Sequence, residues 1–318
     1  MKAVFLDFST LGPDELDAGP LLEVLPDTEF FDSTEAGLIV ERIREAEFVL
    51  TNKSRLDEPA LSSAKWLKFI GLTATGTDNV DLVAAQRLGI AVTNVRAYCT
   101  RSVVEHVFGV LLSLTHNLNR YHRAVKKGDW RKADVFCLLE YPIRELSAMM
   151  LGIVGYGELG RSVAEMARAM GMTTLIARRR GAPATDDGRT DFDEFLERSD
   201  IVSLHCPLTP ETQNLMGAAE FRRMKRDSIL INTARGGLVD SQALVDALRA
   251  GKLGGAGIDV LREEPPARGD PLLDYDGDNL ILTPHIAWAT VEARQNAIDE
   301  LARNVASFLG GERRNRVV

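Results

Sequence analysis

The sequence contains little cysteine, no excess of positive charge and no long apolar run. Only 3 of its 318 residues are cysteine, and Cys99, Cys137 and Cys206 are far apart in the chain. Neither a disulfide framework nor the paired spacing of a metal site is present, so we expect no bound metal. The formal net charge is −8, from 46 acidic and 38 basic residues. This balance offers no broad basic surface to phosphate groups and argues against a nucleic-acid partner.

No segment approaches the roughly 20 consecutive apolar residues that a helix needs to cross a bilayer. The first residues, Met1–Asp7, include an acid early and predict a β-strand rather than a signal peptide. Hydrophobic residues make up 45% of the chain, which is typical of a globular protein, and 318 residues are enough for two domains. We therefore expect a cytoplasmic protein of two domains that does not bind membranes.

The first hundred residues alternate short apolar runs with amphipathic stretches. The apolar runs predict strands at Ala3–Asp7, Glu47–Thr51, Leu67–Leu72 and Ile90–Asn94. Helical patterns lie between them, for example at Ala36–Ala46 and Val80–Leu88. Such alternation predicts parallel strands joined by helical crossovers.

A second alternating series follows a long helical segment. We expect one helix from Arg101 to Lys127, apolar around most of its surface, and then a loop at Gly128–Ala148. Further strands are predicted at Met150–Gly155, Thr174–Ala177, Ile201–Cys206, Ser228–Thr233, Gly255–Asp259 and Leu280–Thr283. A last helix is expected at Thr290–Leu309, before two glycines. The order predicts an α/β protein with two doubly wound parallel sheets of the Rossmann or flavodoxin-like kind.

A glycine-rich turn follows the first strand of the second series. It has the GxGxxG pattern and reads Gly155, Tyr156, Gly157, Glu158, Leu159 and Gly160. The pattern alone is weak, but here a strand precedes it and a helical segment follows. The first glycine permits the tight turn, the second lets a pyrophosphate approach, and the third lets helix and strand pack closely. The sequence therefore predicts a dinucleotide site on these residues.

The end of the next strand indicates which dinucleotide. NAD sites place an acid about 20 residues after the glycines, for the ribose hydroxyls. This chain has Arg178, Arg179 and Arg180 there and no acid. Guanidinium groups suit the 2′-phosphate of NADP, although a solvated basic turn is the plainer alternative. We predict that Arg178 and Arg179 give a preference for NADP, with NAD as a second cofactor that the site accepts.

Three segments that end predicted strands carry an arginine, carboxylates and a histidine. They are Ile231–Gly237, Gly257–Pro265 and Leu282–Trp288. Ligands bind at the carboxyl ends of strands in open α/β sheets. An arginine there can hold a substrate carboxylate, a histidine can protonate a carbonyl oxygen, and a carboxylate can orient the histidine. This set suits the reduction of a keto acid.

These segments resemble the D-isomer-specific 2-hydroxyacid dehydrogenase family over essentially the whole chain. The stretches NTARGG-LVD, D-V-x-x-x-E-P and TPH-I-A carry the resemblance. It implies that Arg235 binds substrate, that His285 is the proton donor in reduction and that Glu264 pairs with His285. It also implies that Asp259 meets the nicotinamide carboxamide. The acid of NAD-using relatives would fall at Arg178, which supports NADP.

The resemblance implies further contacts and a domain plan. Thr233, Ala234, Cys206 and Pro207 would line the cofactor, and the backbone of Thr75 and Gly76 would bind the substrate carboxylate. Residues 1–100 and 290–318 would form a discontinuous substrate domain, and residues 101–289 the nucleotide domain. The active site would lie in a cleft between the two domains and close over the substrate. The segment Ser102–Leu112 resembles the dimerisation region of the family, which implies a homodimer.

Trp288 indicates which members the chain is most similar to. With the stretch HIAWA, it resembles glycerate dehydrogenases, also called hydroxypyruvate reductases, and glyoxylate reductases. A bulky indole so close to the histidine favours a small substrate, so we expect Trp288 to contact it. Phosphoglycerate dehydrogenases are an alternative, but many carry an extra C-terminal domain. A nucleotide-binding regulator or corepressor on the same fold is an alternative from another class.

Overall fold

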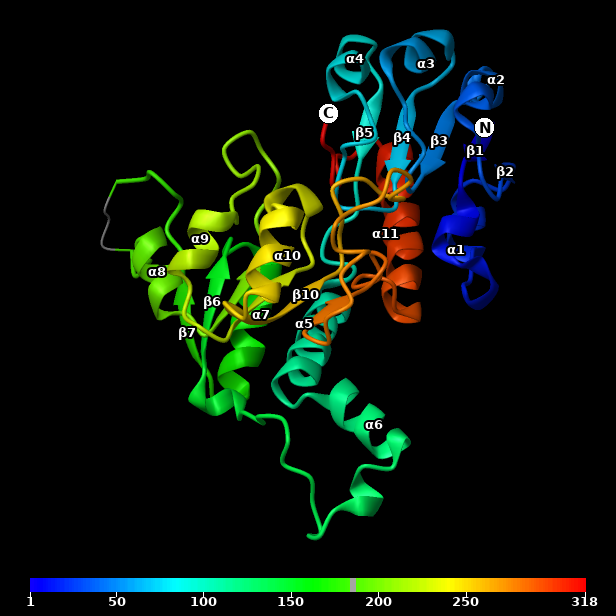
Figure 1. Cartoon of the computed structure of the whole chain (residues 1–318). Helices are drawn as coiled ribbons and strands as arrows, with labels where there is room; N and C mark the ends of the chain where they lie inside the picture. Colours follow the sequence, from blue (N-terminus) through cyan, green and yellow to red (C-terminus); the bar gives the residue numbers. More distant parts are fainter. Residues whose placement is uncertain (184–186) are drawn as a thin grey trace. The chain divides into compact units, whose positions relative to one another are not determined.

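The computed structural model describes residues 1–183 and 187–318, and their contacts divide the chain into two units. Unit 1 consists of Met1–Cys99 and Trp288–Val318, and unit 2 of Thr100–Ala287. Each unit has one parallel sheet flanked by helices (Figure 1). The predicted fold class, α/β with two doubly wound parallel sheets, is confirmed.

The sheet of unit 1 has the strand order β2-β1-β3-β4-β5, and every neighbouring pair is parallel. Its strands are β1 (Ala3–Phe5), β2 (Thr28–Phe30), β3 (Phe48–Thr51), β4 (Phe69–Leu72) and β5 (Ala91–Thr93). Every residue of β3 and β4 is buried, as expected for parallel strands with helices on both faces. Along β1, Ala3 and Phe5 enter one core cluster and Val4 the other, because successive side chains point to opposite faces.

Helices cover both faces of this sheet. They are α1 (Gly19–Val24), α2 (Ile39–Ile43), α3 (Glu58–Ser63), α4 (Leu82–Arg87) and α11 (Val291–Leu309). The long helix α11 begins at a Thr290 cap, whose hydroxyl accepts from the Ala293 amide. It packs tightly against β4, since a Cβ on Gly71 would lie 2.4 Å from a methyl group of Leu301. The C-terminal segment thus completes the core of unit 1.

The sheet of unit 2 has the order β11-β10-β9-β8-β6-β7, again all parallel. Its strands are β6 (Met150–Val154), β7 (Thr173–Ile176), β8 (Ile201–Leu204), β9 (Ser228–Asn232), β10 (Leu253–Ile258) and β11 (Leu280–Leu282). The chain goes from β6 outward to β7 and then returns to β8 on the other side of β6. The strand order reverses at this point, which is where open α/β sheets bind ligands.

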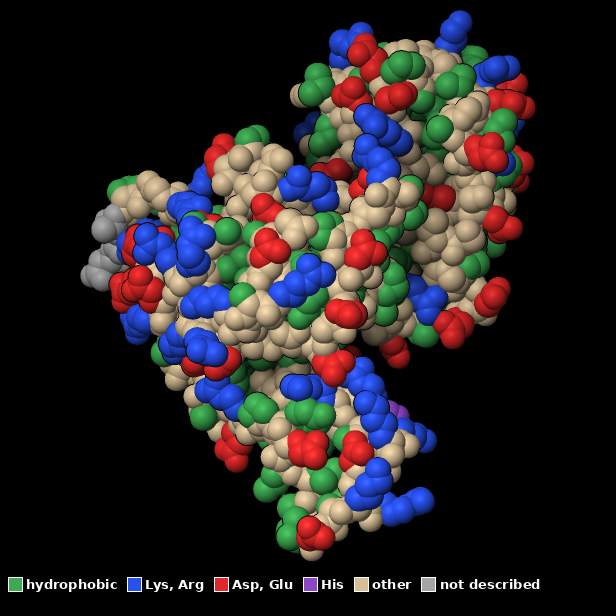
Figure 2. Space-filling model, in the orientation of Figure 1, with side chains coloured by type: hydrophobic (Ala, Val, Ile, Leu, Met, Phe, Trp, Pro, Cys, Tyr) green, Lys and Arg blue, Asp and Glu red, His purple; other side chains and the backbone are tan. Residues whose placement is uncertain are grey.

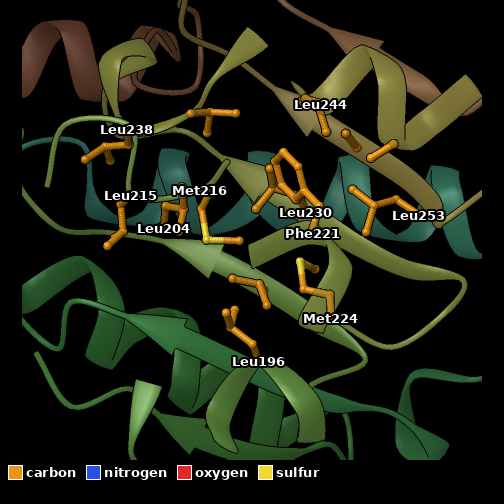
Figure 3. Close-up of a cluster of buried hydrophobic side chains, with 14 of the residues drawn as sticks. Leu196, Leu204, Leu215, Met216, Phe221, Met224, Leu230, Leu238, Leu244 and Leu253 are labelled. Atoms are coloured by element: carbon orange, nitrogen blue, oxygen red, sulfur yellow. The ribbon is translucent and has the colours of Figure 1, made fainter. Parts of the chain in front are cut away.

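Helices also lie on both faces of the unit 2 sheet. They are α5 (Thr100–Thr115), α7 (Glu158–Ala169), α8 (Phe192–Arg198), α9 (Ala218–Arg223) and α10 (Ser241–Arg249), while α6 (Leu118–Lys127) extends away from the sheet (Figure 1). Figure 3 shows the core that α8, α9 and α10 bury against one face, with Leu204 and Leu230 from the sheet and Phe221 and Leu244 from the helices. Helices α5 and α7 pack on the other face and against each other. Short 3-10 turns lie at Phe8–Leu11, Pro13–Glu15, Ala36–Leu38, Trp130–Lys132, Leu146–Ala148 and Gly236–Leu238.

The prediction of a single helix from Arg101 to Lys127 was wrong. The chain forms α5 and α6 instead and changes direction at Asn117, which has a left-handed backbone (φ 52°). Asparagine tolerates this conformation better than most residues. Its side-chain amide donates to the carbonyl of Pro142 (2.7 Å), which fixes the turn. The apolar pattern continued across Asn117, so periodicity alone did not reveal the break.

The helix predicted at Ala36–Ala46 was also too long. The chain makes a 3-10 turn at Ala36–Leu38 and then the short helix α2. Strand β2 was not predicted, because it has only three residues and its central Glu29 is exposed. It forms at the edge of the sheet through pairing with β1. Tertiary pairing, and not a local apolar run, decides this strand.

Candidate active site and cofactor site

The turn between β6 and α7 uses its three glycines in different ways. Gly155 has a left-handed backbone (φ 93°), and a Cβ there would lie 2.6 Å from the carbonyl carbon of His205. A Cβ on Gly160 would lie 2.1 Å from the carbonyl oxygen of Gly155. A Cβ on Gly157 would meet no atom of the described residues within 4 Å. Gly155 and Gly160 are therefore required by the fold, whereas Gly157 borders open space of the kind that a pyrophosphate needs.

Helix α7 points its first turn at this open space. Gly157 is its N-cap residue and supplies no side-chain cap, so the first amides of the helix are available to an anion. Glu158, the first residue of the helix, is exposed and accepts a hydrogen bond from the Thr100 hydroxyl. The backbone carbonyl of Tyr156 accepts from Nε of Arg161 (3.3 Å). Together with Leu159, these residues make up the glycine-rich turn, and the space beside Gly157 is open.

The three arginines after β7 have different surroundings. Arg178 is half-buried and donates to the carbonyl of Arg189 (2.9 Å). Arg179 is 71% exposed and lies 3.8 Å from the Glu211 carboxylate. Arg180 is committed elsewhere, because its guanidinium donates to the buried carboxylate of Glu220. Figure 2 shows that Lys and Arg side chains, with carboxylates among them, gather on the side of unit 2 that holds α8 and α9.

The pKa of the Glu220 carboxyl group is set by two opposing effects, burial and hydrogen bonding. Burial alone would raise the pKa of this carboxyl group, while the hydrogen bonds from Arg180 and from the Gly217 amide lower it, and the net shift is downward. Glu220 therefore stays ionised and holds Arg180 in place. Of the three arginines after β7, Glu220 thus binds Arg180 and does not bind Arg178 or Arg179.

The end of β8 contributes Cys206 and Pro207. Cys206 is half-buried, and burial raises the pKa of its thiol, so the thiol stays protonated. Burial also lowers the pKa of the neighbouring His205 to about 4, so this imidazole is neutral at physiological pH. Its Nε2 lies 2.8 Å from the Ser203 hydroxyl. The strand end is thus uncharged and lies beside the glycine turn, where the His205 amide donates to the Val154 carbonyl (2.7 Å).

Buried Asn232 shapes the loop after β9. Its carboxamide donates to the Arg235 carbonyl (2.9 Å) and accepts from the Ala234 amide (3.1 Å). Arg235 is half-buried, and its guanidinium donates to the Ala234 carbonyl (2.8 Å). The Thr233 hydroxyl oxygen is buried and has no hydrogen-bond partner within the described chain. Such an atom is costly unless a ligand satisfies it, which suits the predicted cofactor contact.

The loops after β9 and β10 pack backbone against backbone. A Cβ on Gly236 would lie 2.0 Å from the carbonyl carbon of Leu261. The Leu261 amide in turn donates to Oε1 of Glu264 (2.9 Å). This contact leaves Oε2 of Glu264 to meet Nδ1 of His285 at 2.6 Å. The predicted pair of Glu264 and His285 thus forms at the carboxyl edge of the sheet, one strand from the loop that carries Arg235.

The His285 side chain is oriented by its carboxylate partner. A carboxylate can only accept, so Nδ1 of His285 carries the hydrogen, and Nε2 is the ring nitrogen that Glu264 does not contact. The backbone of His285 is left-handed (φ 57°). For a residue other than glycine, such a conformation costs about 1–3 kcal/mol and persists only where the surroundings enforce it.

Asp259 enforces it. Only 2% of this residue is exposed, and its carboxylate accepts from the amides of Ile286 and Ala287 at 2.9 Å each. It also accepts from the Thr283 hydroxyl at 2.6 Å, and its backbone carbonyl accepts from the His285 amide at 2.7 Å. The predicted contact of Asp259 with the nicotinamide stays a prediction, and what the structure shows is that Asp259 holds the loop of His285. Sequence analysis missed Thr283 as a partner, although it lies in the TPH stretch.

The substrate residues Thr75, Gly76 and Trp288 belong to unit 1. The loop after β4 is fixed by Asn94, whose amide donates to the Thr75 carbonyl (2.7 Å), and by the Thr75 hydroxyl, which donates to the Val95 carbonyl (2.9 Å). Within the described residues, the amides of Thr75 and Gly76 have no protein acceptor, as an anion site requires. Trp288 packs against the unit 1 core with its ring 6.4 Å from that of Tyr98.

The structure brings the remaining predicted site residues to one edge of the unit 2 sheet. They follow β6 (Gly155–Gly160), β7 (Arg178, Arg179), β8 (Cys206, Pro207), β9 (Thr233, Ala234, Arg235), β10 (Asp259, Glu264) and β11 (His285). In residues 1–183 and 187–318, no group of three or more His, Cys, Asp or Glu side chains is placed to hold a metal ion. No helix in the described part of the chain is both long enough and apolar enough to cross a membrane.

Comparison with known proteins identifies relatives along nearly the whole chain. Residues 108–287 match the family model for the NAD-binding domain of D-isomer-specific 2-hydroxyacid dehydrogenases. A glycerate dehydrogenase of Methylorubrum extorquens is 46% identical over 88% of both chains, and a hydroxypyruvate reductase of Blautia hydrogenotrophica is 36% identical over 98% of both. Among solved structures, an acyclic imino acid reductase in complex with NADPH and D-Arg superposes with a TM-score of 0.87, at 26% identity and full coverage of both chains.

The three glycine roles can be separated by substitution. Gly157→Ala should leave the melting temperature nearly unchanged, because a methyl group there meets no protein atom. It should raise the KM for the dinucleotide about tenfold or more, because the methyl group takes space from the pyrophosphate. Gly160→Ala is the matched control and should lower stability by about 1–3 kcal/mol through overpacking. Thermal melts and cofactor titrations measure both effects, and an unchanged KM in Gly157→Ala would show that no phosphate lies there.

Proposed function

The chain belongs to the D-isomer-specific 2-hydroxyacid dehydrogenase family, and from this premise we propose that it reduces hydroxypyruvate and glyoxylate to their hydroxy acids with NADPH. As a member of this family it is an oxidoreductase that uses a nicotinamide cofactor. The observation that carries the proposal is the Glu264–His285 pair (2.6 Å) at the carboxyl edge of a sheet whose glycine turn borders open space at Gly157.

Arg235 binds the substrate, and His285 donates the proton. The guanidinium of Arg235 binds the substrate carboxylate through two parallel hydrogen bonds. The nicotinamide, when bound, supplies the hydride to the carbonyl carbon. His285, protonated on both nitrogens, gives the Nε2 proton to the carbonyl oxygen, so that the keto group becomes a hydroxyl group. In the oxidation direction the neutral Nε2 takes the hydroxyl proton back.

Glu264 serves His285 through Nδ1. The carboxylate of Glu264 fixes the plane of the ring and the position of the Nδ1 hydrogen through the 2.6 Å contact. Both side chains are about one-third exposed, which leaves a path for the proton to be replaced from water. The two groups therefore form an acid that can be recharged after each turnover.

The cofactor would lie on unit 2 and the substrate carboxylate would also meet unit 1. The amides of the glycine turn and of the first turn of α7 would hold the pyrophosphate. The buried hydroxyl of Thr233, the loop at Ala234 and the uncharged end of β8 would line the rest of the cofactor. Thr75 and Gly76 would offer their backbone amides to the carboxylate. Residues 1–100 with 290–318 would thus be the substrate domain, and residues 101–289 the nucleotide domain.

NADPH is proposed over NADH because this chain has basic side chains at the position where NAD-binding sites carry an acid. An acid there would repel the 2′-phosphate of NADPH, whereas arginines can bind it. Arg178 and Arg179 follow β7, and Glu220 holds the third arginine away. Solved relatives of this fold include one in complex with NADPH. An arginine pair is the group best matched to a phosphate.

A homodimer is proposed from the apolar side chains that unit 2 leaves in solvent. Helix α6 and the stretch after it extend away from the sheet of unit 2 (Figure 1). Phe136 is 89% exposed and Leu139 78%, and Trp130 and Val135 are also exposed. Surfaces of this kind mark interaction sites. A second copy of the chain is the proposed occupant. The cytoplasm is the proposed location, since Cys99, Cys137 and Cys206 form no disulfide within the described residues.

The substrate proposal predicts a ranking of keto acids. With NADPH, the specificity constant kcat/KM for hydroxypyruvate and glyoxylate should exceed that for pyruvate and for a branched 2-keto acid by about tenfold or more. Trp288→Ala should bring the branched acid to within about threefold of hydroxypyruvate, because the indole no longer restricts the pocket. Steady-state oxidation of NADPH measures both. Dinucleotide binding without turnover of any keto acid would instead identify a nucleotide-binding regulator.

The cofactor proposal predicts the effect of the two arginines. Replacing Arg178 and Arg179 together by Gln should lower the ratio of kcat/KM for NADPH over NADH about 10- to 100-fold, the value of one or two charged hydrogen bonds. Arg180→Gln is the control and should leave this ratio unchanged, since that guanidinium binds Glu220. A wild-type enzyme that favours NADH, or a ratio that only Arg180→Gln changes, would contradict the assignment.

The dimer proposal predicts a change of mass in solution. Wild-type protein should sediment at twice the mass of one chain, and Phe136→Asp with Leu139→Asp should sediment as a monomer, because a buried apolar contact cannot accept two carboxylates. Val83→Asp is a matched control, as Val83 is 78% exposed on α4. A monomeric wild type, or a double variant that remains dimeric, would refute this interface.

A further inference from the structure

The Thr283 hydroxyl has two partners, and their chemistry fixes the direction of both hydrogen bonds. Oγ1 of Thr283 lies 2.6 Å from Oδ1 of Asp259 and 3.2 Å from Nε2 of His106. A hydroxyl group has one proton, and the carboxylate can only accept it. The Thr283 oxygen must therefore accept from His106, so Nε2 of His106 carries a hydrogen. The result is a chain of two hydrogen bonds, in which His106 donates to Thr283 and Thr283 donates to Asp259.

His106 comes from α5, and the face of that helix also carries a second tie to the same loop. Ser102 lies one turn before His106, and its buried hydroxyl donates to the carbonyl of Ala287 (2.6 Å). Residues four apart share a helix face. Val110 is one more turn along and packs on β10, where a Cβ on Gly257 would lie 2.3 Å from its methyl group. Close packing on Gly257 thus brings the Ser102 and His106 side chains within reach of the loop.

The loop from Thr283 to Ala287 is therefore held at both ends from α5 and in the middle from Asp259. The middle contains His285, in a left-handed backbone that Asp259 enforces through the amides of Ile286 and Ala287. Without the Thr283 proton and the His106 donor, the Asp259 carboxylate would lose one of its hydrogen bonds and a nearby partial charge, since His106 Nε2 lies 3.8 Å from Oδ1. A rotated Asp259 would release the two amides.

We propose that Ser102, His106 and Thr283 are positioning residues of the reaction, which hold His285 in its reactive place through the Asp259 carboxylate and the Ala287 carbonyl. The inference rests on the proposed role of His285 as proton donor. None of the three residues needs to touch substrate or cofactor. Their effect on turnover would come from geometry, because a displacement of about 1 Å in a catalytic group can slow a reaction roughly 100-fold.

The first test uses Thr283→Val, which keeps the shape of the side chain and removes the hydroxyl. We expect kcat for the reduction of hydroxypyruvate to fall about 10- to 100-fold, with the KM for NADPH changed less than about threefold. With NADPH deuterated at the transferred position, the isotope effect on kcat should increase, because the chemical step becomes slower than product release. Thr283→Ser keeps the hydroxyl and should restore most of the turnover.

Thr115→Val is the matched control for loss of a buried hydroxyl. Thr115 also lies on α5, where its hydroxyl donates to the Leu111 carbonyl (2.9 Å), and it is outside the chain of contacts. It should change the melting temperature as much as Thr283→Val but leave kcat and the isotope effect unchanged. A loss of activity that follows melting temperature in both variants, or an isotope effect that Thr283→Val leaves unchanged, would reduce Thr283 to a structural residue.

A second pair of variants and a second readout keep the test independent of the folding of one variant. His106→Leu removes the donor and should slow turnover as Thr283→Val does, whereas His106→Gln keeps an N–H donor and should lose less. Hydrogen exchange of the peptide that contains Ile286 and Ala287 should be slow in the wild type and about tenfold faster in the Val and Leu variants. Unchanged exchange in both would overturn the proposal. A wild type without turnover would defeat the proposed function, while the exchange would still report on the loop.

Discussion

The buried carboxylate of Asp259 is the interaction on which the rest of the site depends. It follows β10 directly, and its two oxygens collect a hydroxyl and two backbone amides from the loop after β11. An ionised group with so little exposure is tolerable only when it is fully hydrogen-bonded, so the loop must adopt the one path that supplies these donors. That path includes the left-handed backbone of His285. The position of His285 is thus a consequence of the hydrogen bonds that the buried Asp259 carboxylate requires.

The parallel sheet explains why the other groups meet the histidine. Neighbouring strands β9, β10 and β11 end at one edge, and their loops carry Arg235, Glu264 and His285 in that order. Gly236 lets the first two loops touch, which directs Glu264 toward His285. Because β6 is parallel to these strands, the glycine turn that follows it lies at the same edge of the sheet, where the strand order reverses. One topology therefore supplies both the glycine turn and the Glu264–His285 pair.

Much of this arrangement could be predicted from the sequence, because it depends on short motifs after apolar strands. The glycine turn and the strand ends were identified in this way, and the pairing of Glu264 with His285 followed from the family resemblance. The parts that were missed depend on contacts between residues distant in the chain. Nothing local marks Asn117 as a helix break until Pro142 accepts its amide. Nothing local marks Asp259 as the support of His285, since its partners lie at Thr283 and on α5, and the exposed Glu29 hides β2 until it pairs with β1.

The most direct test of this account is a crystal structure of the wild-type protein with NADPH and oxamate, whose amide carbonyl stands in for the keto group. The account predicts that Nε2 of His285 lies about 2.6–3.2 Å from that carbonyl oxygen, while His285 keeps its positive φ and Asp259 keeps the amides of Ile286 and Ala287. Arg235 should hold the oxamate carboxylate. A structure in which Asp259 releases those amides, or in which another side chain meets the carbonyl oxygen, would contradict the claim that Asp259 holds the proton donor in place.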